Sequence, residues 1–197
     1  MGIRIGVLAL QGNVSEHIEA FQEAASEIGY PAGSACVFPL RKTEDIPGCD
    51  AIAIPGGEST TISRLIDKNG MREPLRNFTG GIFATCAGMI LVSSETGDPR
   101  VTPLCLFDMT VDRNAFGRQR ESFECDLPIR GIEGGPFHAV FIRAPAVTQA
   151  GPEVEVLAGI EKEIVAVRKG KHVAFAFHPE LGSDRRLHTA FLRNLGF

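Results

Sequence analysis

The sequence predicts a three-layer α/β fold in which helices flank a mixed, mostly parallel central sheet. Residues 3–10 form a nearly continuous apolar run, which is typical of a strand covered on both faces. Short apolar runs and helical patterns then alternate up to about residue 100. Beyond that point apolar segments follow one another without intervening helices, which predicts an antiparallel extension of the parallel core.

A helix is expected directly after the first strand. Asn13 can cap it, Glu16 can reach back as in a capping box, and Gly29 ends the pattern. The helix is expected to bury a stripe made of Ile18, Phe21, Ala25 and Ile28. Further elements of this half are expected to be strands at residues 35–38 and 51–54 and a helix over residues 60–69.

The second half of the chain is expected to be rich in strands and to end in a helix. Ser183 or Asp184 can cap that helix, whose buried face holds Leu187, Phe191 and Leu195. The expected strands are residues 104–111, 137–142, 154–157, 164–167 and 173–177. Since no internal repeat or linker divides the sequence, we expect one domain over residues 1–197.

Composition and charge argue against several classes of protein. The chain has 197 residues, of which 44% are apolar, and this suffices for one sizeable core. The net charge is −4 and no run of Lys or Arg forms a basic stripe, so a small polar ligand fits better than nucleic acid or a membrane surface. The apolar run near the N-terminus has only strand length and no cleavage-like sequel, and we expect a cytoplasmic protein.

The cysteines give no sign of a metal site or of a disulfide framework. None belongs to a C-x-x-C pair or lies at metal-ligand spacing from a histidine. Cys86 alone has a setting that suggests chemistry, and the others are expected to be buried or idle. The five cysteines are Cys36, Cys49, Cys86, Cys105 and Cys125.

Cys86 lies where a short apolar run ends abruptly in small residues, in the segment Ile82-Phe83-Ala84-Thr85-Cys86-Ala87-Gly88. This pattern is typical of a strand-to-helix turn that carries a nucleophile, because a bulky neighbour would collide with the flanking elements. The N–H groups of the following helix would favour the thiolate. Taken alone, the segment fits a buried structural cysteine equally well.

A second apolar run, residues 173–177, ends in His178-Pro179-Glu180. If the strand continues, residues two apart share a face, so His178 and Glu180 would point the same way. An imidazole oriented by a carboxylate beside a thiolate forms a catalytic triad with cysteine as nucleophile, which favours the catalytic interpretation of Cys86. Structural or exposed positions are expected for the remaining histidines, His17, His138, His172 and His188.

A glycine-rich turn, Pro55-Gly56-Gly57-Glu58-Ser59-Thr60, is expected between a strand and a helix. Its glycines can bring backbone N–H groups close to a ligand, as an oxyanion hole requires, although an ordinary turn with Ser59 or Thr60 as helix cap is the alternative. Glu58 can hold an α-ammonium group. An amino-acid substrate also needs a cation for its carboxylate, and the candidates are Arg113 and Arg143, unless both are surface residues.

These segments occur in one chain and in order, and through them the sequence resembles the glutaminase subunits of pyridoxal 5′-phosphate synthase. The set of Cys86 with His178-Pro179-Glu180 marks the wider class of triad glutamine amidotransferases, which implies a flavodoxin-like class I amidotransferase fold. The resemblance covers essentially the whole chain. Leu8-Ala9-Leu10-Gln11-Gly12 also matches that family, and the segments that narrow the resemblance to the vitamin B6 branch are Asn114-Ala115-Phe116-Gly117-Arg118-Gln119 and Phe141-Ile142-Arg143-Ala144-Pro145.

The resemblance implies that the chain hydrolyses L-glutamine to L-glutamate and ammonia. Cys86 would be the nucleophile, His178 the acid and base, and Glu180 its orienter. The oxyanion donors would be N–H groups near Gly57 and Ala87, and we expect a docked partner to reshape the segment Gln11-Gly12 and complete the hole. The glutamine pocket implied by the resemblance is lined by Gly57, Glu58, Ser59, Arg113, Ile142 and Arg143.

The resemblance also implies a partner, a (β/α)₈-barrel synthase that combines the ammonia with a pentose phosphate and a triose phosphate. The chain has no P-loop and no lysine set for Schiff-base chemistry, so we expect it to bind no cofactor.

One alternative function is that of a triad glutaminase for another acceptor, as in histidine biosynthesis. Another is a non-hydrolytic protein that uses the cysteine for redox sensing or chaperone-like binding. Ala84 stands where the wider family usually has glycine, which predicts a slightly more crowded turn.

Overall fold

The computed structural model describes residues 2–31, 33–116 and 122–197, and its main element is a nine-stranded sheet. One half of this sheet is parallel, with strand order β2-β1-β3-β4-β11. The crossovers between these strands carry helices, as the alternation in the sequence predicts. The parallel strands are β1 (Arg4–Leu8), β2 (Cys36–Leu40), β3 (Ala51–Ile54), β4 (Gly81–Thr85) and β11 (His172–Phe175).

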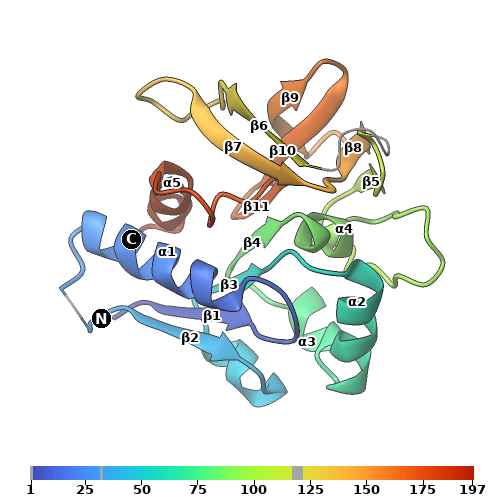
Figure 1. Ribbon diagram of the computed structural model, residues 1–197. Helices are drawn as coiled ribbons and strands as arrows, with labels where there is room; N and C mark the ends of the chain where they lie inside the picture. The colour runs from blue at the N-terminus through green and yellow to red at the C-terminus, as the bar shows by residue number, and fades with distance from the viewer. Residues whose placement is uncertain (1, 32, 117–121) are drawn as a thin grey trace.

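The other half of the sheet is antiparallel and begins where β10 pairs with β11. From β10 the sheet continues through β8 to β5, and β9 also pairs with β10. A separate hairpin of β6 and β7 lies beside this half (Figure 1). These strands are β5 (Met109–Asp112), β6 (Ser122–Leu127), β7 (Phe137–Ile142), β8 (Ala146–Ala150), β9 (Glu155–Ile160) and β10 (Glu163–Lys169).

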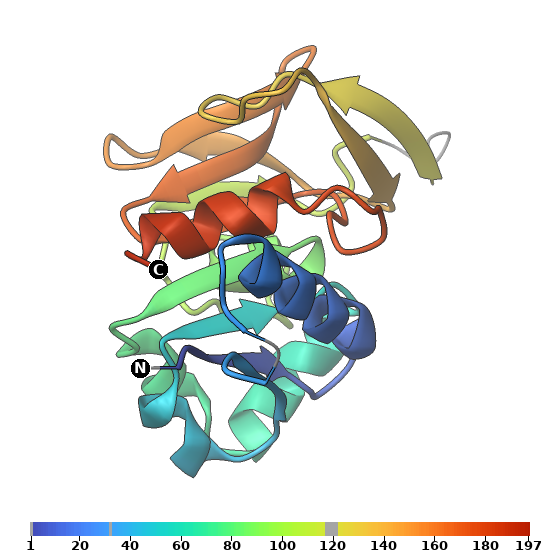
Figure 2. The same cartoon turned by 90° about the vertical axis from the view of Figure 1, so that its left-hand side faces the viewer.

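Helices cover both faces of the parallel half, which completes the three layers (Figures 1 and 2). On one face α1 packs against α5, and on the other α2 packs against α4. The predicted α/β fold with an antiparallel extension is therefore confirmed. The helices are α1 (Val14–Glu27), α2 (Ser59–Lys68), α3 (Arg72–Arg76), α4 (Ala87–Val92) and α5 (Arg186–Asn194), and a 3₁₀ helix, η1, spans Thr43–Gly48.

The core between α1, α5 and the sheet is aromatic. Phe83 on β4 packs edge-on against Phe21 of α1 at 5.2 Å and against Phe191 of α5 at 5.3 Å. Phe175 on β11 also contacts the Phe83 ring at 5.2 Å. Each fully buried phenylalanine contributes roughly 1.5–3 kcal/mol, so this cluster fixes both helices on the two strands that lead to the candidate site.

Two details of the helices differ from expectation. The buried stripe of α1 passes through His17, Ala20 and Ala24, whereas the predicted Ile18 and Ile28 are only half-buried. Asn13 stands at the N-cap of α1, but its side chain makes no capping hydrogen bond there. At α5 the N-cap is Arg185 and not the predicted Ser183 or Asp184, although the Asp184 carboxylate accepts a hydrogen bond from the Arg186 backbone N–H at 3.0 Å.

The strand predictions also needed correction. β6 and β8 were missed, since polar residues interrupt the apolar pattern of both. The predicted strand over residues 104–111 shortens to Met109–Asp112, and the one over 173–177 ends at Phe175. Since His178 begins a turn closed by a hydrogen bond from the Leu181 N–H to its carbonyl, strand alternation does not orient the His178 and Glu180 side chains.

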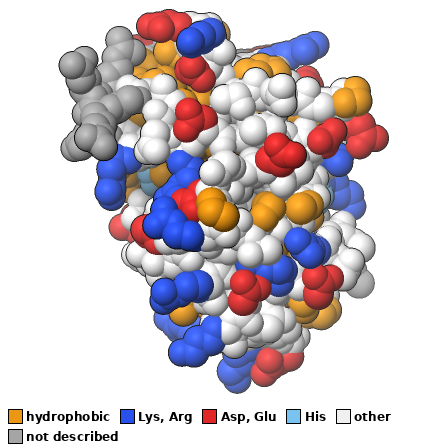
Figure 3. Space-filling model, turned by 90° about the vertical axis from the view of Figure 1, so that its right-hand side faces the viewer, with side chains coloured by type: hydrophobic (Ala, Val, Ile, Leu, Met, Phe, Trp, Pro, Cys, Tyr) orange, Lys and Arg blue, Asp and Glu red, His pale blue; other side chains and the backbone are white. Residues whose placement is uncertain are grey.

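The surface carries charges of both signs. On the face shown in Figure 3, Lys and Arg side chains lie interspersed with Asp and Glu, in keeping with the small net charge of −4. Within the described residues, no helix combines the length and the apolar character that a membrane crossing requires.

Candidate active site

Cys86 occupies the sharp turn between β4 and α4. Its backbone has φ 50° and ψ −108°, a strained conformation that costs roughly 1–3 kcal/mol for a residue with a side chain. Neighbouring backbone holds it there, because the Cys86 N–H donates to the Phe175 carbonyl at 2.8 Å. The turn also requires a small residue at position 88, where a Cβ atom on Gly88 would lie 2.1 Å from the Ile54 carbonyl oxygen. This is the predicted nucleophile-type turn.

Ala84 lies within β4, before the turn itself. It is fully buried and pairs with Ile54 on β3 and with Ala174 on β11. Its methyl group therefore faces a small neighbour on β11, in regular strand geometry.

Adjacent strands bring Cys86 and His178 together. Thr85 on β4 and Phe175 on β11 are in register, so the chain segments that follow them emerge side by side. The His178 backbone is held from a third element, since its N–H donates to the Val140 carbonyl on β7 at 2.9 Å. Cys86 and His178 line the same cavity, and the Cys86 thiol is 3.8 Å from the Ile142 carbonyl oxygen.

Glu180 contacts the other side of the same ring. His178 Nδ1 lies 2.8 Å from Glu180 Oε1, which leaves Nε2 for the thiol. Burial disfavours the charged ring, but hydrogen bonds with Cys86 and Glu180 and their negative charges outweigh it and raise the pKa of His178 to about 10. For Glu180, burial raises the pKa, yet the neighbouring charges of His17 and His178 and the hydrogen bond from His178 bring it down to about 2. The pair is therefore charged at neutral pH.

Two residues around Glu180 were not predicted to contact it. Asn13 donates from Nδ2 to Glu180 Oε1 at 3.2 Å. His17, which is fully buried, lies 3.6 Å from the same oxygen and 3.1 Å from the Thr85 hydroxyl. The only sequence signal was position, since both residues begin the helix that follows the first strand. Sequence reasoning had assigned Asn13 to capping and His17 to structure or solvent.

A cavity of about 380 Å³ opens above Cys86. Its lining comes from six stretches of the chain, which follow β1, β3, β4, β5 and β11 or lie at the end of β7. Among the sequence-predicted site residues, it is lined by Gln11, Gly57, Glu58, Ser59, Cys86, Ala87, Arg113, Ile142, Arg143 and His178. Two predicted residues are not in this lining: Glu180 lies behind His178, and Gly12 backs the glycine turn, where a Cβ atom on it would lie 1.8 Å from the Gly56 carbonyl oxygen.

The glycine turn closely approaches both Cys86 and His178. A Cβ atom on Gly56 would lie 2.5 Å from Cε1 of His178 and 3.2 Å from Cβ of Cys86. Gly57 has φ 147°, a conformation that favours glycine. The side-chain carbonyl of Gln11 accepts a hydrogen bond from the next N–H, that of Glu58, at 2.9 Å. Gln11 thus holds the turn from the side of the first strand.

Glu58 is the N-cap of α2 and faces Arg113 across the cavity. Its carboxylate accepts hydrogen bonds from the backbone N–H groups of Thr60 and Thr61, at 3.1 and 2.7 Å. Burial raises the pKa of Glu58, but the hydrogen bonds from Thr60 and Thr61 lower it to about 2. Arg113 Nη2 lies 3.3 Å from Glu58 Oε1. The structure thus brings together one predicted anion and one predicted cation of an amino-acid site.

Arg143 also lines the cavity, at the end of β7, with φ 44°. Asn114 contributes as well, and its backbone N–H donates to the Asp112 carboxylate at 2.8 Å. Gly117, Arg118 and Gln119, the remaining diagnostic residues of that segment, lie outside the described residues. Among the residues that are described, no group of three or more His, Cys, Asp and Glu is placed to hold a metal ion.

A cysteine in a strained turn near a charged histidine–carboxylate pair, at the edge of a parallel sheet, is the arrangement expected of a hydrolase with a cysteine nucleophile. Comparison with known proteins gives the family. Residues 7–196 match the model of the SNO glutamine amidotransferase family, and the chain belongs to that family. The predicted relationship is thereby confirmed.

Close relatives agree over their full length. The chain is 64% identical over 194 residues to "Pyridoxal 5'-phosphate synthase subunit PdxT" of Methanoregula boonei, covering 98% of this chain and 100% of the relative. It is 61% identical to the protein of the same name from Methanosphaerula palustris, covering 100% of this chain and 99% of the relative. A crystal structure described as a glutamine amidotransferase matches with a TM-score of 0.84 and 44% identity, covering 98% of this chain and 99% of the other.

Proposed function

We propose that this chain is the glutamine-hydrolysing subunit of a pyridoxal 5′-phosphate synthase and that Cys86, His178 and Glu180 are its catalytic triad. The relatives that match over almost the whole chain carry the first part of the proposal. The second part depends above all on one observation, the 2.8 Å contact between His178 and Glu180 beside the strained Cys86. The whole chain, residues 1–197, acts as a single amidotransferase domain.

In the first step, the Cys86 thiolate attacks the side-chain amide carbon of glutamine, and the carbonyl oxygen becomes an oxyanion. The N–H groups of Gly57 and Ala87 are the proposed donors to it, and a donor of this kind contributes about 2.7–4 kcal/mol. His178, with its raised pKa of about 10, is protonated and gives its proton to the departing ammonia. The product is a thioester between Cys86 and the glutamyl group.

In the second step, water hydrolyses the thioester. Once the sulfur is acylated it no longer carries a negative charge, so one of the causes that raise the His178 pKa is lost, and the ring, which has given up its proton, stays neutral and can accept another. Neutral His178 takes a proton from water, the hydroxide attacks the thioester carbon, and glutamate leaves. Glu180 keeps the same ring tautomer throughout because it binds Nδ1.

The cavity has the polar groups that a glutamine needs. Glu58 is the proposed partner of the α-ammonium group, and Arg113 or Arg143 that of the α-carboxylate. Gly57, Ser59 and Ile142 complete the proposed binding wall. A volume of about 380 Å³ suits a substrate of this size.

Free ammonia is protonated and lost in water, so the product must pass to a second active site. The proposed partner is a (β/α)₈-barrel synthase subunit, and a cytoplasmic location remains a prediction. Docking of that partner is proposed to reshape the segment Gln11-Gly12, because Gln11 binds the Glu58 N–H at 2.9 Å and so controls the glycine turn. The relatives' shared name favours this acceptor over one in histidine biosynthesis.

The test uses the complex reconstituted with the synthase subunit. Cys86→Ser is expected to reduce glutamate release by at least about 10⁴-fold, since the nucleophile is lost. Cys36→Ser, at an exposed cysteine outside the cavity, is the matched control and should behave like wild type. Undiminished glutamate release by Cys86→Ser would refute the triad, and equal activity with and without the synthase would refute control by the partner.

A further inference from the structure

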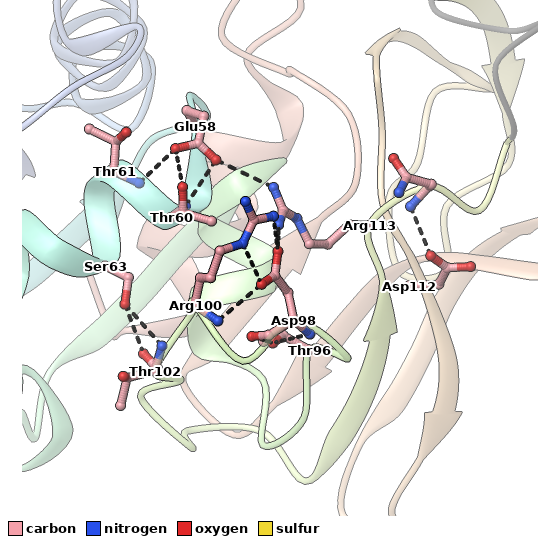
Figure 4. A network of polar contacts seen from close by, with 11 residues as sticks. Glu58, Thr60, Thr61, Ser63, Thr96, Asp98, Arg100, Thr102, Asp112 and Arg113 are labelled. Carbon is pink, nitrogen blue, oxygen red and sulfur yellow. Dashed lines mark hydrogen bonds and ion pairs between the residues drawn. The ribbon is translucent and has the colours of Figure 1, made fainter.

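Arg113 lies between two carboxylates, one in the cavity and one behind it (Figure 4). In front, its Nη2 is 3.3 Å from Glu58 Oε1. Behind, its Nη1 contacts Asp98 Oδ2. The side chains of Arg113 and Asp98 are only 24% and 12% exposed, so this pair is shielded from water much more than a surface ion pair.

The Glu58 carboxylate has no acceptor position left for a ligand. An ionised carboxylate offers about four lone-pair sites. Three are occupied by the N-terminus of α2, through the Thr60 N–H, the Thr60 hydroxyl and the Thr61 N–H. Arg113 occupies the fourth. An ammonium group that binds at Oε1 of Glu58 therefore displaces Arg113.

This exchange leaves Arg113 with a free face. The guanidinium is a planar fork with five N–H donors, so one side can stay on Asp98 while the other takes a new partner. The head group of an amino acid supplies that partner, because its carboxylate is attached to the same carbon as the ammonium. The Glu58–Arg113 contact thus resembles the contacts that a bound zwitterion would make.

Asp98 is itself held from two sides. Its Oδ1 accepts hydrogen bonds from the Arg100 backbone N–H at 3.0 Å and from Arg100 Nε at 2.9 Å. The hydrogen bonds from Arg100, together with the charges of Arg100 and Arg113, keep the pKa of Asp98 well below its usual range. Arg100 reaches it from solvent, with a side chain that is 73% exposed.

We propose that Asp98 is a positioning residue for substrate recognition: it holds the Arg113 guanidinium at the cavity wall, where the α-carboxylate of glutamine replaces Glu58 as its partner. The proposal rests on the glutaminase function proposed above. It assigns the carboxylate to Arg113 rather than to Arg143, and it gives Asp98 a role that depends wholly on Arg113.

Asp98→Asn in the reconstituted complex tests this role. The substitution keeps the Oδ1 acceptor for the Arg100 N–H but removes the charge that holds Arg113. The KM for glutamine is expected to rise roughly tenfold, the effect of losing one hydrogen bond to a charged group, while kcat stays within about twofold. A fall in kcat with an unchanged KM would overturn the proposal.

A double-mutant cycle separates positioning from a general structural effect. If Asp98 acts through Arg113, then Asp98→Asn adds nothing once Arg113→Ala is present, and the two variants have the same KM. A further rise in KM in the double variant would overturn the proposal.

Arg100→Gln is the matched control, since it removes the solvent-side partner of Asp98, and its KM should stay within about twofold of wild type. A rise in the KM of Arg100→Gln equal to that of Asp98→Asn would mean that the effect comes from disturbing the loop that holds Asp98 and Arg100, and not from Arg113.

These outcomes differ from failure of the function itself. If the wild-type complex releases no glutamate from glutamine, the proposed function is wrong. If the wild-type complex is active but the double variant shows the product of the KM increases of Asp98→Asn and Arg113→Ala, only the role proposed for Asp98 is wrong.

Discussion

At the scale of single residues, the space around Gly56 shows how tightly the catalytic pair is enclosed. Glycine is required at position 56 because a side chain there would collide with the His178 ring, and not because the backbone needs a conformation that only glycine adopts. Gly88 plays the same part on the other side of the nucleophile, against the backbone of β3. Small residues on both sides let the cysteine turn and the histidine approach each other.

Gly56→Ala is therefore expected to reduce turnover strongly. Its new methyl group would lie 2.5 Å from His178 Cε1 and must displace the ring, and a displacement of about 1 Å from the reacting geometry costs on the order of 100-fold in rate. Glutamate release by the complex measures this, with the melting temperature as a check on folding. Gly182→Ala, where the nearest obstacle is 3.9 Å away, should keep wild-type turnover. Full activity of Gly56→Ala would contradict the close approach.

The sequence led to the residues of the proposed triad but not to those that support them. Cys86 and the segment His178-Pro179-Glu180 each end a recognisable apolar run, so local pattern was enough to select them. Asn13 and His17 reach Glu180 only because the start of α1 lies beside the segment that follows β11. No local pattern encodes such a contact, since it depends on how distant segments fold together.

At the scale of elements, the start of α1 shows how tertiary contacts override a local rule. Asn followed three residues later by Glu predicts a capping box. In the structure the Glu16 carboxylate accepts a hydrogen bond from the Ser15 hydroxyl, and Asn13 points to Glu180 instead. The buried carboxylate gains more from a donor than the exposed helix end does, because water can satisfy the latter.

Asn13→Asp separates the two roles. Asp and Asn cap helices about equally well, so a capping residue would tolerate this change. In this structure it would set a second carboxylate about 3.2 Å from Glu180, and we expect a loss of roughly 1–3 kcal/mol in unfolding free energy and lower turnover at pH 7. Thermal or urea unfolding measures the first effect. Asn13→Ser, which keeps a capping side chain without charge, should be less destabilising, and the reverse order would support the capping role.

Among the strands, the sequence predicted the parallel half better than the antiparallel half. β3 was predicted with its observed bounds, because a strand buried on both faces is a continuous apolar run. β6 alternates exposed and buried residues, and β8 ends in exposed ones, so neither forms such a run. The β7 segment was found, but its contact with the His178 backbone was not, since a hydrogen bond between backbone atoms leaves no mark in sequence.

At the scale of the whole molecule, α1 and α5 cover the parallel half through a core that contains a histidine. The His188 ring stacks on Phe83 at 4.7 Å and meets Phe21 edge-on at 4.9 Å. Both of its ring nitrogens are buried without a hydrogen-bond partner among the described residues. Burial, together with the charge of His17, lowers the pKa of His188 well below its usual value, so the ring is neutral.

His188→Phe is expected to stabilise the protein by about 1 kcal/mol or more, because it removes a buried polar group that has no partner and keeps an aromatic ring in place. Chemical unfolding at pH 7 measures the change. His172→Phe is the control in the opposite direction, since His172 Nδ1 accepts a hydrogen bond from the Ile82 N–H at 3.2 Å, and we expect it to destabilise. A clear loss of stability in His188→Phe would contradict the absence of a partner.

The same variant should alter the response to acid. Below pH 6.5 the unfolded chain binds a proton at His188 whereas the folded chain does not, since its folded pKa is lowered. The free energy of unfolding therefore decreases as the pH falls below 6.5, and it is unaffected by this group above that value. In His188→Phe this contribution is absent, so the decrease between pH 6.5 and 5 should be shallower than in wild type. Equal slopes would contradict burial of a neutral ring.

The pairing of β4 with β11 has a consequence for the newly made chain. The ribosome completes the turn that holds Cys86 well before it reaches β11, and contacts between distant segments form late because they must close a long loop. Until β11 docks, the thiol has neither its base nor the Phe175 carbonyl that anchors its strained backbone. In the proposed mechanism Cys86 therefore gains its base only when the last strand of the sheet has docked, and an unfinished or misfolded copy would carry an ordinary cysteine that hydrolyses no glutamine.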